Sequence, residues 1–173
     1  MVYVILFIVE MLALICVCWM VFFLSTFAHE LGHALVYMLI TGKTHWHIRI
    51  GSGRSLLKTQ RFSIKLAVFD GEFEIKEDRM ESKTKAIFTL LGGPLFSLIL
   101  VGFLLYTRLN IGTFDSVVIS SETILSVLNL SLFVNTGILL FALAPIHYFW
   151  GEMKGMESDI LQIVHLLKSK RNN

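Results

Sequence analysis

The sequence contains few of the residues that interrupt or cross-link a chain, with two prolines and two cysteines among 173 residues. Cys16 and Cys18 lie in an apolar run, where they are typical of small buried side chains and do not indicate a disulfide or a metal knuckle. Charged residues make up only 16% of the chain and the net charge is +2, so no nucleic-acid partner is expected. Hydrophobic residues make up 55%, and the mean hydropathy is +0.71. This composition predicts a single domain, residues 1–173, embedded in a lipid bilayer.

Three long apolar segments, residues 1–41, 86–106 and 122–150, are the candidate membrane spans. About 20 residues cross a bilayer, so the second and third segments each match one span. The first would form a helix of nearly 60 Å at about 1.5 Å per residue, and must therefore tilt, bend or project from the membrane. It has no proline and no hairpin signal, and it lacks the basic start and cleavage site of a signal peptide. We expect one long, retained helix there.

The distribution of basic residues predicts the orientation of these spans. Residues 42–85 hold ten of the fifteen Lys and Arg residues, the tail after Gly151 holds four, and the 107–121 loop holds only Arg108. By the positive-inside rule, residues 42–85 and the C-terminus face the cytoplasm. With three spans, the N-terminus is then on the opposite side.

A small β region is expected between the first and second spans, within residues 42–85. The stretch RFSIKLAVFDGEFEIK, residues 61–76, alternates apolar and polar positions on both sides of Asp70-Gly71. An Asp-Gly pair between two such runs is a strong hairpin signal, so we predict a turn there. The preceding HIRIGSGRSLLK, residues 47–58, adds one or two strands around its glycines. The sheet should lie against the cytoplasmic face of the membrane.

The stretch STFAHELGHALVYM, residues 25–38, places His29, Glu30 and His33 inside an apolar helix. Two histidines four residues apart point from the same helix face and can bind one metal ion. Glu30 can reach a water molecule on that metal without taking a coordination position, as a general base must. The alternative is a set of polar side chains satisfied by neighbouring helices. Ionisable residues are costly in hydrocarbon, which favours the metal site.

A catalytic zinc ion usually has three protein ligands, so a third must come from elsewhere in the chain. Asp159 is the strongest candidate, because it opens a short amphipathic stretch, residues 157–170, on the same side as the end of the first helix. The other histidines are better explained as interfacial or surface residues. The remaining candidates are Glu152, Glu157, His147, His45 and His47.

Three motifs carry a resemblance to a known family. They are AHELGHAL at 28–35, LLGGPLFSLIL at 90–100, and FALAPIH at 141–147 followed by ESDILQIVHLL at 157–167. In this order they resemble the site-2-protease-type intramembrane metalloproteases, peptidase family M50, of the small type found in bacterial cell membranes.

The resemblance implies a mainly α-helical membrane protein with a core of three transmembrane helices. It also implies a zinc cofactor held by His29, His33 and Asp159, with Glu30 as the catalytic base. The active site would lie toward the cytoplasmic side. Gly92, with the Gly-Pro pair that follows it, would begin the second core helix, where small residues allow close packing against the first.

Two positions depart from the family pattern. Family members commonly have Asn where this chain has Ala142, and Gly where it has Ile160. Asn135 cannot replace the missing amide, because it lies seven residues from Ala142, about 10 Å along a helix. Loss of an amide that stabilises an oxyanion costs about two to three orders of magnitude in rate, and Ile160 would bend the backbone that directs Asp159.

The function indicated is zinc-dependent hydrolysis of a transmembrane segment of a substrate membrane protein, near its cytoplasmic end. The exposed edge of the expected 62–76 hairpin would receive the unwound segment as an added strand. Two alternatives remain open. One is an inactive relative that binds transmembrane helices as a chaperone or regulator, and the other is a small transporter or channel subunit.

Overall fold

The computed structural model describes residues 1–76, 80, 82–110, 121–149 and 151–169. The fold is mainly helical, with a small two-stranded antiparallel sheet, as expected from the sequence. Three of the described helices, α1, α2 and α3, are long and apolar enough to cross a membrane, which is compatible with a multi-pass membrane protein. The elements in chain order are α1 (Val2–Thr41), β1 (Trp46–Lys58), β2 (Phe62–Ile75), α2 (Lys83–Asn110), α3 (Ser121–Leu143), the 3-10 helix η2 (Gly151–Met153) and α4 (Asp159–Lys168).

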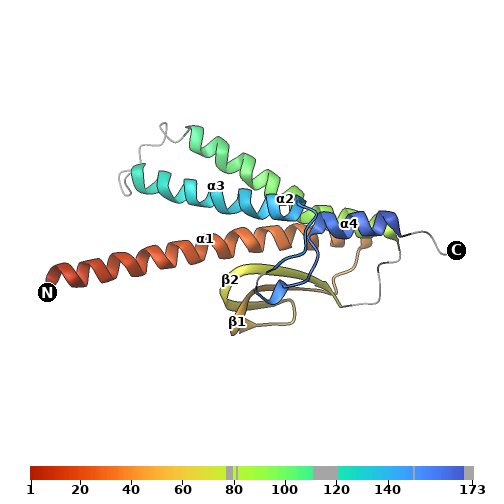
Figure 1. Ribbon diagram of the computed structural model, residues 1–173, viewed down its shortest axis with the longest axis horizontal. Coiled ribbons are helices and arrows are strands. Elements are labelled where there is room, and N and C mark those ends of the chain that lie inside the picture. The colour runs from red at the N-terminus through yellow and green to blue at the C-terminus, as the bar shows by residue number, and fades with distance from the viewer. Residues whose placement is uncertain (77–79, 81, 111–120, 150, 170–173) are drawn as a thin grey trace.

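The first apolar segment forms one continuous helix of 40 residues, α1, which confirms the expectation of a single long helix. It ends where Gly42 adopts a left-handed conformation with φ of 68° and its N–H donates to the carbonyl of Met38. Residues 1–17 are all exposed, and the N-terminal part of α1 extends beyond the other elements in Figure 1. Its length and its exposed, largely apolar surface are compatible with a membrane-spanning helix.

The other two long helices, α2 and α3, run side by side and approach α1 at the end nearer α4 (Figure 1). The end of α3 lies at Leu143, before residue 150 where the apolar segment was expected to end. Pro145 explains this difference, because proline disfavours the helical conformation of the residue before it and provides no N–H. The chain then continues in an extended conformation toward α4.

The extended chain after α3 pairs with the segment that leads into α4. The N–H of Tyr148 donates to the carbonyl of Met156 at 2.9 Å, and the N–H of Ser158 donates to the carbonyl of Ile146 at 3.0 Å. The Ser158 hydroxyl also donates to the carbonyl of Ala144 at 2.6 Å. These bonds fix the first residue of α4 relative to the end of α3. The predicted amphipathic helix is present as α4 but is shorter, and residue 170 lies outside the described residues.

The β region is present, but its turn is not where the sequence indicated. The chain reverses between Lys58 and Phe62, whereas Asp70 and Gly71 lie inside the continuous strand β2. The prediction of a hairpin turn at these two residues is therefore wrong. Residues 46–50 of β1 pair with residues 71–75 on one side, and residues 48–50 also pair with residues 62–64 on the other.

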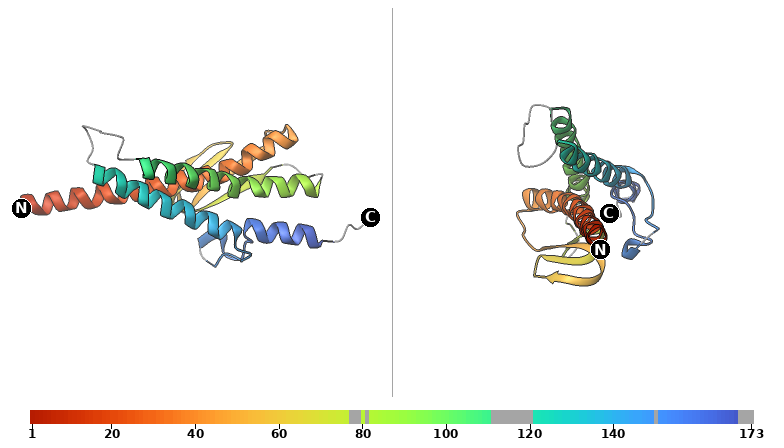
Figure 2. Two further views of the ribbon diagram at one scale, coloured as in Figure 1. Left: turned by 90° about the horizontal axis from the view of Figure 1, so that it is seen from above. Right: turned by 90° about the vertical axis from the view of Figure 1, so that its left-hand side faces the viewer.

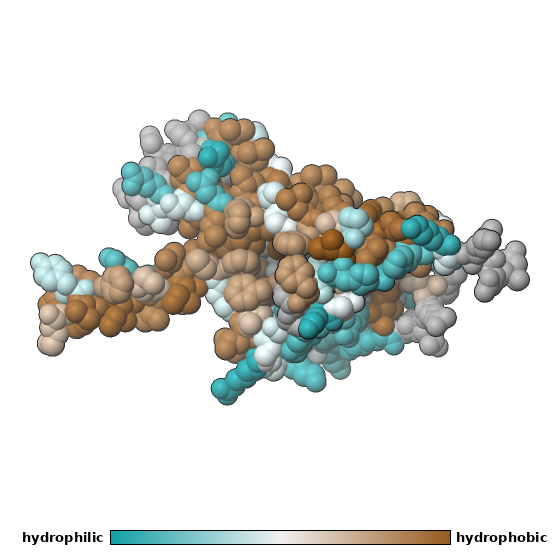
Figure 3. Space-filling view, in the orientation of Figure 1, coloured by the Kyte–Doolittle hydropathy of each residue, from teal (hydrophilic) through white to brown (hydrophobic). Residues whose placement is uncertain are grey.

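The sheet packs along α1 and forms the buried core of the molecule. Ile48, Ile50 and Val68 from the strands contact Ala34 and Tyr37 from α1, and all five are buried. In Figure 2 the sheet lies on one side of α1 and the α2–α3 hairpin on the other. Hydrophilic residues gather over the sheet and α4 in Figure 3, whereas the long helices are hydrophobic. α4 lies toward the end of the molecule opposite the N-terminus, and the sheet lies beside the C-terminal half of α1 (Figure 1).

Candidate metal centre

The two histidines of α1 face a close crossing with α2. A Cβ atom added to Gly32 would lie 2.5 Å from the carbonyl oxygen of Gly92, and one added to Gly92 would lie 2.5 Å from the carbonyl oxygen of Gly32. Only glycine at both positions allows the two backbones to approach this closely. The expected packing of the Gly-Gly-Pro segment against the helix that carries the histidines is confirmed at Gly92.

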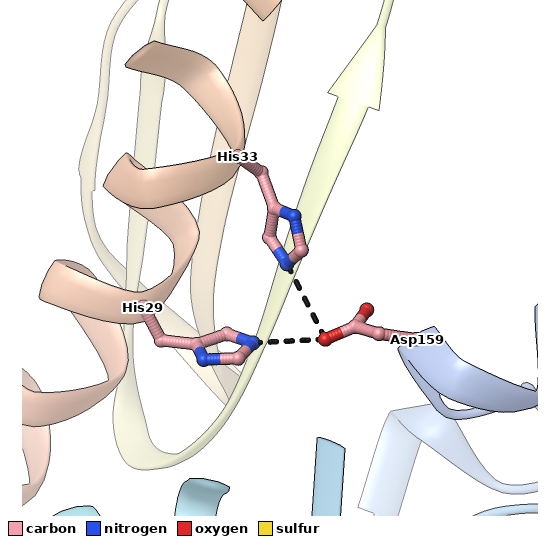
Figure 4. Close-up of side chains that lie close together, drawn as sticks. All are labelled: His29, His33 and Asp159. Atoms are coloured by element: carbon pink, nitrogen blue, oxygen red, sulfur yellow. Dashed lines mark hydrogen bonds and ion pairs between the residues drawn. The ribbon is translucent and has the colours of Figure 1, made fainter. Parts of the chain in front are cut away.

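Three potential ligand atoms converge beside this crossing. Asp159 Oδ2 lies 3.2 Å from His29 Nε2 and 3.5 Å from His33 Nε2. Figure 4 shows both imidazoles directed from α1 toward the first residue of α4. The three atoms lie within 4.8 Å of one another. Atoms bound tetrahedrally to one zinc ion at about 2.0–2.2 Å would lie about 3.3–3.6 Å apart. This group could therefore hold a metal ion without a large rearrangement.

The second nitrogen of each imidazole is held by a hydrogen bond. His33 Nδ1 lies 2.8 Å from the carbonyl oxygen of Thr89 and 3.2 Å from the backbone nitrogen of Gly93. The tautomer that is protonated at Nδ1 donates to the Thr89 carbonyl and leaves the lone pair of Nε2 available. His29 Nδ1 lies 2.8 Å from the hydroxyl oxygen of Ser97, which can accept in the same way. Such contacts orient a metal-binding histidine and select the tautomer that leaves Nε2 available.

Gly93 leaves room in front of both imidazoles. A Cβ atom at this position would lie 2.7 Å from His29 Nε2 and would overlap His33 Nε2. Any other residue would fill the space that a bound ion needs. The chemistry of the donors and the space at Gly93 therefore both fit a metal ion.

Asp159 is directed into this space by the start of α4. Ser158 is the N-cap, and its hydroxyl accepts a hydrogen bond from the N–H of Leu161 at 3.4 Å. Ile160 continues the helix, and no described non-glycine residue has a positive φ, so Ile160 does not distort the backbone at Asp159. Burial alone would raise the pKa of Asp159, but His33 and His29 outweigh it and hold that pKa well below its usual range. Asp159 is thus kept as a carboxylate.

Glu30 lies beside the three ligand candidates but is not part of the group that could bind a metal ion. Its side chain is buried against β2, where a Cβ atom added to Gly71 would lie 2.6 Å from Glu30 Oε1. Gly71 is therefore a close-approach glycine within a strand. This contact explains why an Asp-Gly pair that resembles a turn occurs in the middle of β2.

The ligand group opens into a cleft with two compartments. The larger compartment has a volume of about 230 Å³ and is lined by the two imidazoles, Asp159 and residues 71–73 of β2. The smaller, of about 80 Å³, extends toward α3 and contains Ala142. The residues that line both compartments are His29, Glu30, Gly71, Tyr148 and Met153.

Tyr148 lines both compartments, although no pattern in the sequence singles it out. Burial raises the pKa of its phenol, and the negative charges of Asp159 and Glu30 raise it further. The phenol therefore remains a protonated hydroxyl group. Tyr148 lies in a loop far along the chain from the histidines, and only the tertiary fold brings it to the cleft. Ser97 was also missed, although a hydroxyl within the apolar part of a helix is a usable signal.

The other candidate ligands lie elsewhere in the described part of the chain. Glu152 accepts a hydrogen bond from Lys65 Nζ at 2.6 Å. Glu157 Oε1 lies 2.9 Å from His165 Nδ1 and 3.7 Å from His147 Nε2.

The two histidines near β1 are also outside the ligand group. His47 Nδ1 lies 3.2 Å from the carbonyl oxygen of Gln60. His45 lies just before the start of β1. Of the candidates considered, the structure brings only Asp159 to the two α1 histidines.

Ala142 and Asn135 lie in different places. Ala142 is buried and lines the smaller compartment beside Glu30. The amide nitrogen of Asn135 donates to the hydroxyl of Ser25 at 2.8 Å, and Asn135 lines a separate apolar cavity of about 380 Å³ between the long helices. As expected, Asn135 does not take the place of an amide at position 142.

Comparison with known proteins identifies no relative. No family model matches the chain, and no curated protein or solved structure matches it. Function must therefore be inferred from the residues of the cleft and their surroundings.

Proposed function

We propose that the protein is an intramembrane zinc endopeptidase of the site-2-protease type, similar to peptidase family M50, which hydrolyses a transmembrane segment of a substrate membrane protein. The observation that carries this proposal is the convergence of His29 Nε2 and His33 Nε2 on Asp159 Oδ2, within 3.2 and 3.5 Å. Glu30 lies beside them as an acid outside the ligand group. Two imidazoles, one carboxylate and an uncoordinated glutamate form the usual set of a catalytic zinc site.

His29, His33 and Asp159 would hold the ion, and nitrogen and carboxylate ligands of this kind suit zinc. When bound, zinc would polarise the scissile carbonyl group and make a water molecule more acidic. The hydrogen bonds to Ser97 and to the carbonyl of Thr89 would keep the two imidazoles in position throughout the reaction.

Glu30 would move the proton. Its carboxylate accepts a proton from the water molecule as the water oxygen bonds to the carbonyl carbon. It returns that proton to the amide nitrogen as the C–N bond breaks. One water molecule is consumed, and the products are a new carboxyl group and a new amino group. Contact with Gly71 and burial restrict the carboxylate to this position.

The substrate segment must be extended before it can react, because a helix hides its carbonyl groups in hydrogen bonds. Residues 71–73 of β2 line the cleft, and residues 71–75 pair with β1 on one side. Addition of the unwound segment along the side that faces the cleft would hold its backbone beside Glu30. The edge therefore comes from the end of β2 and not from the 62–76 hairpin expected from the sequence.

The position of the site along α2 supports cleavage near one membrane face. Gly93 lies eight residues after Lys85, the last charged residue before the apolar part of α2, which corresponds to about 12 Å along a helix. Because the basic residues gather in residues 42–85 and at the C-terminus, that face would be the cytoplasmic one.

The first test of this proposal is metal content. Zinc per chain is measured on protein purified in detergent, for the wild type, His33→Ala and Asp159→Ala. His47→Ala serves as a control, because His47 lies outside the ligand group. About one zinc ion in the wild type and the control, with loss in the other two variants, is expected. A wild type that binds no added zinc would refute the proposal.

The second test is proteolysis. Transmembrane peptides in proteoliposomes should be cleaved by the zinc-loaded wild type and not by Glu30→Gln. Glu122→Gln at the start of α3 is the matched control and should cleave normally. Cleavage by Glu30→Gln at the wild-type rate would exclude Glu30 as the base.

One feature favours a second candidate, a relative without proteolytic activity that binds transmembrane helices as a chaperone or regulator. Ala142 gives the smaller compartment a methyl group where the resembled family commonly has an amide. In this case the zinc-loaded wild type and Glu30→Gln would capture the same transmembrane peptides, and neither would cleave them.

A further inference from the structure

Asp159 reaches the two histidines of α1 at the end of a long connection. The connection, residues 144–158, runs from the end of α3 to the start of α4, and its described part contains only one short helix, η2. A metal-binding side chain must be held within about 0.5 Å of its productive position. The contacts that join the two ends of the connection therefore determine whether Asp159 is in place.

The three potential ligands are held in different ways. His29 Nδ1 lies 2.8 Å from the hydroxyl oxygen of Ser97, and His33 Nδ1 lies 2.8 Å from the carbonyl oxygen of Thr89, so each ring is oriented by a partner on its far side. The carboxylate of Asp159 contacts the two imidazoles themselves. Its position before a metal ion binds therefore depends on the backbone of its own segment.

The side chain of Ser158 joins the two ends of the connection. Its hydroxyl donates to the carbonyl oxygen of Ala144 at 2.6 Å and accepts from the N–H of Leu161 at 3.4 Å. The N–H of Ile146 also donates to it at 3.4 Å. One hydroxyl group therefore links the chain just after α3 to the first turn of α4, directly beside Asp159.

Removal of this hydroxyl should loosen the start of α4 without unfolding the connection. Ser158 is 0% exposed, so water cannot easily replace the lost group, and the N–H of Leu161 would lose its acceptor at a cost. The N–H of Ser158 would still donate to the carbonyl of Ile146 at 3.0 Å, and the carbonyl of Ala144 would keep the N–H of Ile146 at 2.8 Å.

We infer that Ser158 is a positioning residue, whose hydroxyl holds the carboxylate of Asp159 where it can join His29 and His33 on one metal ion. This inference rests on the zinc site of the proposed function. Without the hydroxyl, Asp159 would occupy the ligand position for a smaller fraction of the time. The apparent dissociation constant of the metal rises as that fraction falls.

The first test is zinc affinity, measured by competition with a chelator on protein purified in detergent. Ser158→Ala should lower it about 10- to 100-fold. Ser158→Gly should also lower it, and this second variant keeps the helix start, because glycine is tolerated at an N-cap. Ser169→Ala is the matched control and should bind zinc normally. It removes a hydroxyl at the other end of α4, where Ser169 donates to the carbonyl of Leu166 at 3.1 Å.

The second test shows whether Ser158 acts through Asp159. Cu²⁺ is used, because imidazoles bind it more tightly than zinc and its affinity can be measured after Asp159→Ala. All chains carry Cys16→Ser and Cys18→Ser, so that the free thiols do not bind copper. Ser158→Ala should lower copper affinity about 10- to 100-fold when Asp159 is present and less than about twofold in Asp159→Ala. A general loosening of the fold would lower both equally.

The outcomes separate this role from the proposed function. Unchanged zinc affinity in both Ser158 variants, or equal copper losses with and without Asp159, would overturn the role of Ser158 and leave the peptidase proposal intact. A wild type that binds zinc through Asp159 but cleaves no peptide would refute the peptidase proposal, and the two affinity tests would still decide the role of Ser158. A wild type that binds neither metal would overturn both.

Discussion

Alanine substitutions at Gly71 and Gly93 should test separately the proposed base, Glu30, and the two histidines proposed as metal ligands. At Gly71 a Cβ atom would lie 2.6 Å from Glu30 Oε1 and 2.7 Å from Thr26 Cγ2. At Gly93 it would lie 2.7 Å from His29 Nε2 and would overlap His33 Nε2. Gly71→Ala should therefore displace the side chain of Glu30 and leave the imidazoles in place, whereas Gly93→Ala should displace the imidazoles.

The expected loss of activity in Gly71→Ala follows from the overlap between the added Cβ atom and Glu30 Oε1. Ordinary contact with a Cβ atom begins at 3.4 Å, so the carboxylate oxygen of Glu30 must move by about 0.8 Å to relieve the Gly71→Ala overlap. A misplacement of about 1 Å in a catalytic group costs about 100-fold in rate. Overpacking at a buried site also costs about 1–3 kcal/mol of stability. We expect Gly71→Ala to keep its zinc and to lose about 100-fold in kcat.

Gly93→Ala should behave differently, because the added methyl group occupies the space in front of both imidazoles. Zinc affinity should fall by at least about 100-fold, and activity should fall with it. Gly102→Ala is the matched control, because Gly102 lies in the same helix and a Cβ atom there meets no atom within 4 Å.

The assays are zinc content, thermal denaturation and peptide cleavage on the same preparations. Gly102→Ala should match the wild type in zinc content and in cleavage. Loss of zinc in Gly71→Ala, or full activity in that variant, would refute the placement of Glu30 against β2. Normal zinc binding in Gly93→Ala would refute the position of the metal.

Two further predictions concern groups that support the site. Ser97→Ala removes the hydrogen-bond partner of His29 Nδ1 at 2.8 Å and should weaken zinc affinity about 10- to 100-fold, as measured by competition with a chelator, without unfolding the protein. Arg49→Met leaves the buried carboxylate of Asp70, 3.6 Å from the guanidinium, without its ion-pair partner and should cost about 3–5 kcal/mol of stability at neutral pH. Asp70→Asn in the same chain should restore most of that loss, and equal denaturation curves for the single and double variants would contradict this account.

Much of the group that could hold a metal ion was predictable from the sequence, because local chemistry determines much of it. The common direction of His29 and His33 follows from their helical spacing, and the cost of such residues and of Glu30 in an apolar helix is the reason why a functional role was predicted for them. Asp159 was selected by its place at the start of an amphipathic segment, and the structure brings it to the two histidines. The long helix over 1–41 followed from an absence of breakers.

The wrong turn prediction at Gly71 and the omission of Tyr148 have physical causes that a single sequence does not reveal. Gly71 follows Asp70 between two alternating runs, which is the pattern of a turn, yet here the glycine accommodates the side chain of Glu30. Local pattern cannot distinguish a glycine that bends a strand from one that admits a neighbour. Tyr148 has no local pattern at all, because its place in the cleft depends on pairing of two loop segments that the sequence does not mark.

The composition of α1 explains why periodicity could not predict its packing. Different faces of this helix contact different elements, and almost every face is apolar. Trp19, Phe23 and Phe27 form a stacked series on the side of the sheet, whereas Gly32 contacts α2 and His33 faces α4. In an amphipathic helix, the spacing of the hydrophobic residues predicts which single face is buried. A helix whose partners lie on several sides, with lipid as the expected surroundings elsewhere, has no such period, and only its few small and ionisable residues indicate where each partner lies.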